Sequence, residues 1–385
     1  MEKKPKVMFT FVEAGMGHII PMTGMADAFE KKYGDRCEIV RSRIFSESES
    51  PAVRKMGEEQ IRHTKLLSVN LPYRKFEAFS YHLPSRIVHG FLDLHFKKAI
   101  RDCSAELRNA APDLLVASYF LPAHVAAIAN KKELTDTLIA TYSPDPYIYP
   151  AWDRQCDLFL VNNDAAAKMA RKKKFRNIVQ VPFLYKSGLT EIPCEDKAAA
   201  RAAIGLPERF TLLFANGAYG TKKTGKILEK IIAADFPINF VVICGKDEKR
   251  LQSVLALRDR VRRMNLLPMG FTDRIGEYMA ASDLAIGKCG SNTMMESVAL
   301  KCPLLVNAEA NRLEEITARY GVKNGLVLRE TNHKKILKRI EEAIEHPDAL
   351  RAFSKGFDPY RIPNGGEVCA DLLFELLKKK FPELR

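Results

Sequence analysis

The sequence predicts an α/β protein with two doubly wound domains, each built on a parallel sheet. Three observations predict this fold class. Short apolar strands alternate with amphipathic helices along nearly the whole chain, a glycine-rich turn follows the first strand of each half, and the alternation breaks once, near the middle. Strand–helix alternation is typical of parallel sheets covered by helices. A chain of 385 residues has room for two such domains.

The first half is predicted to hold six strands. An apolar, β-branched run forms the first of them, and the glycine-rich turn Gly15–His18 follows it. A helix is expected to begin at Pro21, because proline favours the first helical turn. The predicted strands are 6–12, 38–40, 113–117, 138–142, 158–161 and 178–181. Such strands, separated by helices, predict one parallel sheet.

Turn signals interrupt the pattern at 186–208, where Gly188, Pro193 and Gly205 occur, and this segment is predicted to be the linker. A second series follows, with predicted strands 210–215, 238–244, 284–286, 304–306 and 326–328, and helices 224–233, 251–263, 274–281, 292–300 and 334–345. We therefore predict an N-terminal domain 1–185, a linker 186–208, a C-terminal domain 209–365 and a last amphipathic helix within 366–385. Two such sheets are expected to bind ligands in the cleft between them.

The composition narrows the class of partner. The formal net charge is +14, which favours an anionic partner: a nucleic acid, an anionic membrane surface or a phosphorylated ligand. The 46% of apolar residues excludes a disordered chain. Eight cysteines without any C-x-x-C pair favour free thiols in a reducing, cytoplasmic compartment. Neither a signal peptide nor a run of about 18 apolar residues is found, so no membrane span is expected.

The region 51–110 is basic and rich in aromatic residues, and it contains four histidines, at positions 63, 82, 89 and 95. One interpretation is a pair of ordinary helices that cover the sheet. The alternative is an amphipathic surface that lies on anionic lipid. No H-x-x-H or H-x-x-x-H pair occurs, so a metal cluster is not expected. The basic run 171–176 precedes a predicted strand and is interpreted as the end of a helix, so no nucleic-acid partner is predicted.

The turn after the first strand carries two titratable residues, Glu13 and His18. Its glycines allow a ligand close to the backbone, but the third glycine of a dinucleotide fingerprint and the lysine of a P-loop are missing. A carboxylate can orient an imidazole and make it a better base. We predict that His18 is a catalytic base oriented by Glu13. Glu13 as the direct base is one alternative, and His18 as a helix cap is another.

The second half has a matching turn, Asn216–Gly220, followed by lysines. A glycine turn that opens a helix suits phosphate, because backbone amides and the helix dipole favour an anion. A plain strand–helix turn is the alternative. A second turn of this kind, Gly290–Thr293, opens a later helix. Its amides, with the Ser291 and Thr293 hydroxyls, are expected to hold a diphosphate, and Glu296, one turn further, to accept the ribose hydroxyls.

The stretch 270–303 resembles the nucleotide-sugar signature of family 28 glycosyltransferases. That family includes monogalactosyldiacylglycerol synthases, processive diacylglycerol glucosyltransferases and the peptidoglycan N-acetylglucosaminyltransferase. The residues that carry the resemblance are Gly270-Phe271, Ala281-Ser282-Asp283, Lys288-Cys289-Gly290, Thr293, Glu296 and Pro303. The resemblance implies a GT-B fold, in which two Rossmann-like domains face each other across a cleft.

The resemblance also implies roles for individual residues. Donor-binding residues would be Gly217, Ala218, Tyr219, Gly220, Gly245, Phe271, Thr272, Gly290, Ser291, Asn292, Thr293, Glu296, Glu309 and Asn311. Acceptor-side residues would be Gly15, Met16, Gly17, Tyr149 and Trp152. Tyr149 replaces the histidine of the lipid-synthesising members' His-Pro-x-Trp, which leaves the acceptor side open. A lone Glu309, where the family usually has glutamine, leaves the donor sugar open.

The implied activity is inverting transfer of a hexose from a UDP-sugar to a hydroxyl. The expected acceptor is a membrane lipid, either diacylglycerol or a polyprenyl-linked compound, and the expected location is the inner face of the cell membrane. No Asp-x-Asp pair lies by the donor turns, so neither a metal nor another cofactor is expected. The alternatives are a catalytically silent nucleotide-sugar-binding protein, a transferase with a soluble acceptor, and a sugar-nucleotide epimerase of the same fold.

Overall fold

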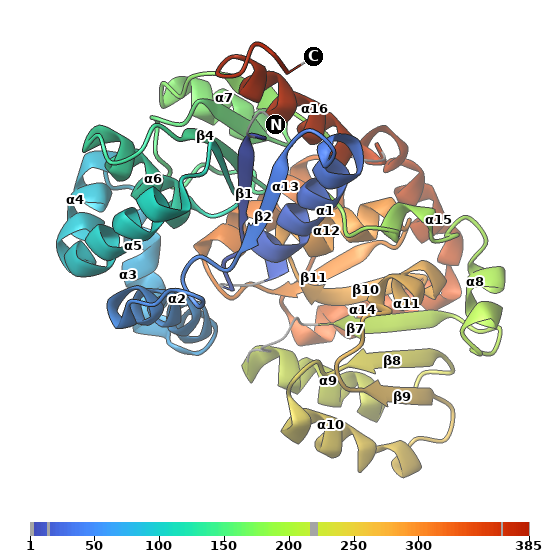
Figure 1. Cartoon of the computed structure of the whole chain (residues 1–385). Coiled ribbons are helices and arrows are strands. Elements are labelled where there is room, and N and C mark those ends of the chain that lie inside the picture. The colour runs from blue at the N-terminus through green and yellow to red at the C-terminus, as the bar shows by residue number, and fades with distance from the viewer. Residues whose placement is uncertain (1–3, 14–15, 216–221, 363–364, 385) are drawn as a thin grey trace. The chain divides into compact units, whose positions relative to one another are not determined.

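The computed structural model describes residues 4–13, 16–215, 222–362 and 365–384 (Figure 1). The chain divides into two compact units. Unit 1 comprises Met1–Leu66, Leu71–Lys186 and Ile362–Arg385, and unit 2 comprises Leu67–Asn70 and Ser187–Arg361. The residues predicted to form a linker, from Ser187 onward, therefore belong to unit 2, and the C-terminal segment belongs to unit 1.

Unit 1 is built on a six-stranded parallel sheet with the order β2-β1-β3-β4-β5-β6. Its strands are β1 (Lys6–Thr10), β2 (Glu38–Ser42), β3 (Leu114–Ala117), β4 (Leu138–Ser143), β5 (Leu158–Val161) and β6 (Ile178–Gln180). All six lie within three residues of their predicted bounds. The strand order reverses at β1, which pairs with β2 on one side and β3 on the other. A reversal of this kind opens a crevice at the carboxyl ends of the two central strands.

Helices cover both faces of this sheet. They are α1 (Met16–Tyr33), α2 (Pro51–Val69), α3 (Leu71–Ser80), α4 (Ser85–His95), α5 (Lys97–Ala110), α6 (Phe120–Lys131), α7 (Asp164–Lys172) and α16 (Gly365–Lys378). The region 51–110 thus forms four helices, α2 to α5, which gather on one side of unit 1 in Figure 1. Alternate residues of β1 enter separate cores: Val7 and Phe9 pack on one face, and Met8 packs on the other.

The helix after β1 begins earlier than the sequence predicts. It was expected to start at Pro21, but α1 already begins at Met16 and includes that proline. Proline has no N–H, so it removes one hydrogen bond near the helix start without ending the helix. Gly17 and His18 therefore lie in the first turn of a helix and not in a loop.

The C-terminal helix α16 packs on α1 within unit 1. The rings of Tyr33 and Phe374 stack with centroids 4.0 Å apart. The Asp371 carboxylate accepts hydrogen bonds from Lys32 and from the Tyr33 hydroxyl, at 2.5 and 2.6 Å. The far end of the chain is thus attached to the helix that carries His18.

Unit 2 is built on a second six-stranded parallel sheet, with the order β12-β11-β10-β7-β8-β9. Its strands are β7 (Thr211–Ala215), β8 (Asn239–Ile243), β9 (Asn265–Met269), β10 (Leu284–Lys288), β11 (Leu304–Ala308) and β12 (Val327–Arg329). Its helices are α8 (Lys197–Ala203), α9 (Lys222–Ala234), α10 (Glu248–Leu255), α11 (Ile275–Ala281), α12 (Ser291–Ala299), α13 (Arg312–Lys323), α14 (His333–Glu345) and α15 (Pro347–Lys355). Counted from β7, this is the strand order of Rossmann folds, reversing between β7 and β10.

The sequence analysis missed β9 and extended a helix too far. Residues 251–263 were predicted to be one helix, but α10 ends at Leu255 and a separate strand, β9, follows. Proline inside Asn265–Met269 argues against a strand, yet β9 lies at the edge of the sheet, where proline is tolerated. Helices α13 and α15 were also not predicted.

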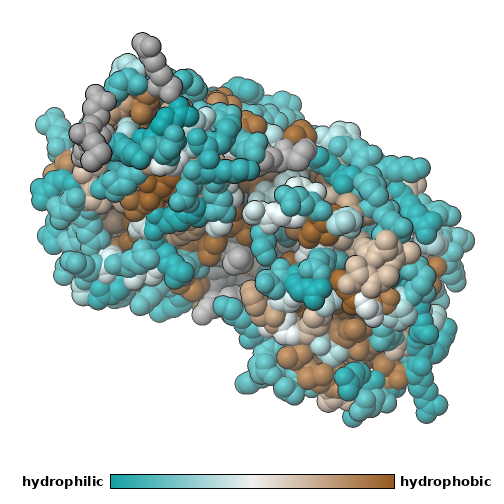
Figure 2. All heavy atoms as spheres, turned by 45° about the vertical axis from the view of Figure 1, so that its right-hand side comes forward, coloured by the Kyte–Doolittle hydropathy of each residue, from teal (hydrophilic) through white to brown (hydrophobic). Residues whose placement is uncertain are grey.

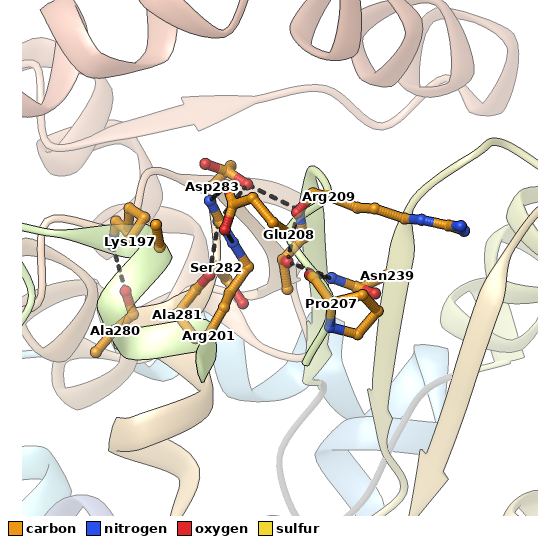
Figure 3. A network of polar contacts seen from close by, with 12 residues as sticks. Lys197, Arg201, Pro207, Glu208, Arg209, Asn239, Ala280, Ala281, Ser282 and Asp283 are labelled. Atoms are coloured by element: carbon orange, nitrogen blue, oxygen red, sulfur yellow. Dashed lines mark hydrogen bonds and ion pairs between the residues drawn. The ribbon is translucent and has the colours of Figure 1, made fainter. Parts of the chain in front are cut away.

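Asp283 anchors the amino end of the unit 2 sheet. Its carboxylate accepts hydrogen bonds from the Thr211 backbone N–H at 2.8 Å and from Arg201 at 3.1 Å. Arg201 in turn pairs with Glu208 (Figure 3). These contacts hold β10 to β7 and α8, at the end of the sheet opposite to the carboxyl-end turns. The aspartate of the family signature is therefore a structural residue here.

All eight cysteines are buried and free, as predicted. In the part of the chain that the structure describes, every helix is too short or too polar to span a bilayer. On the face drawn in Figure 2, hydrophilic side chains cover most of the surface, and apolar ones form patches among them.

Candidate functional site

Most of the predicted site residues that the structure describes lie at the carboxyl ends of the two sheets, at or beside the point where each strand order reverses. We call the unit 1 group, His18, Ser118 and Tyr119, the unit 1 edge. We call the unit 2 group, the residues that follow β8 to β11, the unit 2 edge. Ligands of open α/β sheets bind at such points.

At the unit 1 edge, a hydrogen bond fixes the ring of His18. Its Nδ1 lies 2.8 Å from the backbone carbonyl oxygen of Ser118, which directly follows β3. A carbonyl oxygen can only accept, so Nδ1 carries the hydrogen and Nε2 keeps its lone pair. The Ser118 hydroxyl donates back to the His18 carbonyl at 2.6 Å. The two bonds join the turn after β1 to the turn after β3.

The surroundings of His18 favour its neutral form. Burial lowers the pKa of His18 below the ordinary imidazole value, and the bond to Ser118 offsets this in part. The edge of the Tyr119 ring packs against the imidazole, with centroids 4.8 Å apart. A neutral imidazole with Nε2 unprotonated is the form that a general base requires.

Glu13 does not orient His18 in this structure, contrary to the prediction. Its carboxylate pairs with Arg43 at 3.5 Å and is 41% exposed. Among the contacts of the described residues, none joins Glu13 to His18. The orienting group is the Ser118 carbonyl, a residue that the sequence analysis missed. Its position directly after β3, at the strand reversal, is the signal that could have found it.

A row of aromatic rings runs from His18 to Tyr149. Tyr119 contacts Phe120 at 4.4 Å, and Phe120 contacts Tyr149 at 5.8 Å between ring centroids. The Tyr149 hydroxyl lies 2.9 Å from the Ser80 hydroxyl, which holds the ring against α3. These partly exposed rings give the unit 1 edge an apolar wall.

Trp152 is placed differently from the prediction. It is 5% exposed and packs edge-on against Phe159 in the unit 1 core. A buried ring of this kind packs in the core and offers little surface to a ligand. Of the remaining predicted acceptor-side residues, Gly17 lies in the first turn of α1, Gly15 lies outside the described residues, and only the backbone of Met16 is described.

At the unit 2 edge, Gly290 is the N-cap of α12, and as a glycine it has no side chain with which to cap the helix. Its first backbone bond runs from the Met294 N–H to the Gly290 carbonyl at 3.0 Å. Ser291, Asn292 and Thr293 form the first turn, and Glu296 lies one turn further and is half-buried. A helix start with glycine at its N-cap, beside the strand reversal, is suited to an anion.

Close packing of β10 against β7 fixes the position at which α12 begins. A side chain on Gly287 would put its Cβ 2.2 Å from the Ala215 carbonyl oxygen, so β10 can approach β7 only with glycine there. The other predicted diphosphate-binding residues, Gly217, Ala218, Tyr219 and Gly220, lie outside the described residues.

Ion pairs fix the loop after β11. Glu309 accepts from Arg329 at 2.7 Å, and Asn311 caps α13 by accepting from the Glu314 N–H at 2.8 Å. Glu314 also pairs with Lys288 at 3.3 Å, and both side chains are 15% exposed. This pair joins the end of β10 to α13. The sequence analysis did not include Glu314, although its place three residues after an N-cap is a capping signal.

The turns after β8 and β9 complete the unit 2 edge. Gly245 takes the left-handed conformation, with φ of 61°. The Cys244 N–H donates to the Met269 carbonyl at 2.7 Å, which holds the two turns together. Phe271 is 68% exposed, a high value for an aromatic residue, and the Thr272 hydroxyl accepts from the Arg274 N–H at 3.1 Å.

The structure also forms a cluster that the sequence analysis did not expect. His89, His124 and Asp153, from α4, α6 and the segment after β4, offer ligand atoms that lie within 4.8 Å of one another. No pair of them shares an element, so no spacing motif could reveal them. The expectation of no metal cluster in region 51–110 considered only spacing within that region, and His89 meets His124 and Asp153 from outside it.

Known proteins resemble this chain in sequence and in fold. Residues 221–351 match the model of the glycosyltransferase family 28 C-terminal domain. The processive diacylglycerol beta-glucosyltransferase of Bacillus subtilis is 22% identical over 349 residues, which span 88% of this chain and 86% of that protein. These matches confirm the predicted resemblance to family 28.

Solved structures share the fold over nearly the whole length. MurG from Acinetobacter baumannii superposes with a TM-score of 0.62 at 12% identity, covering 96% of this chain and 99% of that one. The UDP-GlcNAc 2-epimerase from Neisseria meningitidis, bound to UDP-GlcNAc, gives 0.58 at 13% identity, covering 97% and 100%. Together with the two parallel sheets, these structures confirm the predicted GT-B fold.

Proposed function

We propose that this family 28-type glycosyltransferase transfers a hexose from a UDP-sugar to a hydroxyl of a membrane lipid, with inversion at the anomeric carbon. The observation that carries the proposal is the start of α12 with glycine at its N-cap, after β10 and inside the region that matches the family 28 C-terminal domain. The UDP diphosphate would bind the amides and hydroxyls of the first turn, and Glu296 would hold the ribose.

The acceptor is assigned to the unit 1 edge. Nε2 of His18 would take the proton from the acceptor hydroxyl, whose oxygen would attack the anomeric carbon as UDP leaves. The charge on the departing diphosphate would be stabilised by the helix-start amides. The aromatic row Tyr119, Phe120 and Tyr149 is an apolar surface of the kind that a lipid acceptor requires. Among lipid acceptors we propose diacylglycerol, because the name of the Bacillus subtilis relative contains it.

A transfer assay tests this function. UDP-glucose, UDP-galactose and UDP-N-acetylglucosamine would be offered in turn, with diacylglycerol, polyprenyl-linked and soluble acceptors, and both UDP release and the glycosylated product measured. The expected product is a glycosylated lipid. A soluble product alone would reject the lipid acceptor. UDP-sugar binding without transfer would favour a silent nucleotide-sugar-binding protein, and an isomerised UDP-sugar would favour the epimerase.

We also propose that α4 docks the enzyme on an anionic membrane. Ile87, Phe91 and Leu94 are 48%, 60% and 78% exposed, and their spacing of four and three residues places them on one helix face. Phe79 of α3 is 61% exposed. Exposed basic residues flank this apolar stripe: Arg86, Lys97 and Lys98. Apolar side chains that enter a bilayer, flanked by cations for anionic headgroups, suit a peripheral protein at the cytoplasmic face.

Flotation with vesicles tests the docking surface. The double variant Phe91→Asp/Leu94→Asp is expected to lower partitioning into anionic vesicles at least about tenfold, because each buried apolar side chain contributes about 1.5–3 kcal/mol. Val322→Asp is the control, since Val322 is 47% exposed on α13 of unit 2. Equal flotation of the wild type and both variants, or flotation that does not depend on anionic lipid, would contradict the proposal that α4 is the docking surface.

A further inference from the structure

The cluster of His89, His124 and Asp153 has the arrangement of a metal site. Each histidine uses Nε2 for a second contact: His89 on the Ala151 carbonyl at 3.0 Å and His124 on Asp93 at 2.9 Å. Histidines that bind metals almost always donate their other ring nitrogen to a carbonyl or a carboxylate in this way. Both Nδ1 atoms therefore remain as potential ligands.

The third ligand is Asp153. Its Oδ2 lies 3.1 Å from Nδ1 of His124, and the centroids of the two imidazole rings are 4.5 Å apart. Two atoms bound to a tetrahedral zinc ion at about 2.0–2.1 Å lie about 3.3–3.4 Å apart. The His124–Asp153 pair is thus within a few tenths of an ångström of the separation that zinc requires.

We propose that His89, His124 and Asp153 form a structural site for a divalent zinc ion, with a water molecule as the fourth ligand. Two imidazoles and one carboxylate are ligands that zinc prefers. The ion would replace the proton that His124 now shares with Asp153, and this proton would leave to solvent. Asp93 would stay hydrogen-bonded to Nε2 of His124 and orient that ring.

The site would join three segments of unit 1. His89 lies on α4, which carries the apolar stripe, His124 lies on α6, and Asp153 follows the segment that contains Tyr149. His124 is only 3% exposed, so its side of the site would be shielded from solvent. The inference stands on these unit 1 contacts and does not depend on the proposed transfer reaction.

Zinc binding to the whole protein tests the site. The protein would be stripped with a chelator and dialysed against zinc, and the bound metal measured by elemental analysis. We expect one zinc per chain and the release of about one proton per ion, because the ligands must be deprotonated. The visible spectrum of the cobalt-loaded protein would report tetrahedral coordination.

Variants decide whether these residues are the ligands. His89→Gln can still donate to Ala151, and Asp153→Asn keeps the side-chain shape, so both are expected to fold while binding zinc at least about tenfold more weakly. His95→Gln is the matched control, because His95 also contacts a carboxylate, Glu59 at 3.0 Å, but lies outside the cluster. A wild type that binds no zinc, or folded variants that bind it equally well, would overturn the proposal.

Discussion

The unit 1 edge and the unit 2 edge occupy equivalent places in two similar sheets, but different kinds of contact build them. Each edge lies where the order of a six-stranded parallel sheet reverses. At the unit 2 edge, most of the site residues come from one stretch of chain, from Gly270 to Glu314, and only a few, such as Gly245 and Arg329, join from outside it. At the unit 1 edge, the key contact joins His18 to Ser118, 100 positions later.

This difference shows which parts of a site can be recognised in the sequence and which cannot. A helix start that binds an anion needs glycine and small hydroxyl residues in a row, and such a row is visible in the sequence. A ring oriented by a backbone carbonyl needs no particular side chain at the carbonyl, because every residue has one. The side chain of Ser118 therefore carries no signature, and only its place after β3, at the strand reversal, brings its carbonyl to His18.

The largest expected effect is on kcat, and it tests whether the two edges have separate roles. His18→Ala is expected to lower kcat by about 10²–10⁴-fold, the usual range for loss of a general base, and to leave UDP affinity unchanged. UDP is assigned to unit 2, which this substitution does not touch. Steady-state kinetics and calorimetry would measure the two quantities. A large fall in UDP affinity would contradict the assignment of the general base to unit 1 and of UDP binding to unit 2.

Ser118→Ala is the matched control for His18. It removes the hydroxyl that donates to the His18 carbonyl but keeps the Ser118 carbonyl that orients the ring. Turnover is expected to stay within a few-fold of wild type. A loss as large as that of His18→Ala would mean that the hydroxyl, and not the carbonyl, is the group that matters.

The second effect concerns the unit 2 edge alone. Glu296→Ala is expected to weaken UDP binding by about 1.5–3 kcal/mol, or about 10- to 150-fold, the scale of hydrogen bonds to a charged group. Calorimetry on the folded variant would measure it. Glu341→Ala, at an exposed position on α14, is the control and should bind UDP like wild type. Unchanged affinity for both variants would remove Glu296 from the site.

The same division explains what the sequence analysis found and missed. Runs of apolar residues located 11 of the 12 strands, and the missing one, β9, contains Pro268. Gly290 begins a helix, as the sequence predicts, because a glycine turn that opens a helix is a local feature. Trp152 matched a motif by identity, but its burial depends on Phe159 and the rest of the core. The His89–His124–Asp153 cluster needs three elements, which no spacing rule connects.

A smaller effect is expected at Glu13. Because its carboxylate is 41% exposed and pairs with Arg43, Glu13→Gln is expected to lower turnover by less than about tenfold. If Glu13 were the direct base, this substitution would be at least as severe as His18→Ala. Comparing kcat of the two variants under identical conditions decides between them, since Gln keeps the size of the side chain.

The smallest effect is a shift of the acid limb of the kcat/KM pH profile to lower pH. This shift tests the electrostatics of the unit 1 edge directly. Burial lowers the pKa of His18 below 6.5, so protonation begins only at a lower pH than for an exposed imidazole. The neutral base then persists through pH 7, and kcat/KM is expected to fall only as pH drops through the lowered pKa. The acid limb of the profile should therefore lie below pH 6.5. The limb must be absent from the residual activity of His18→Ala if it belongs to this ring. A limb at or above 6.5 that disappears in the variant would show that His18 acts in a more polar setting than its contacts with Ser118 and Tyr119 provide.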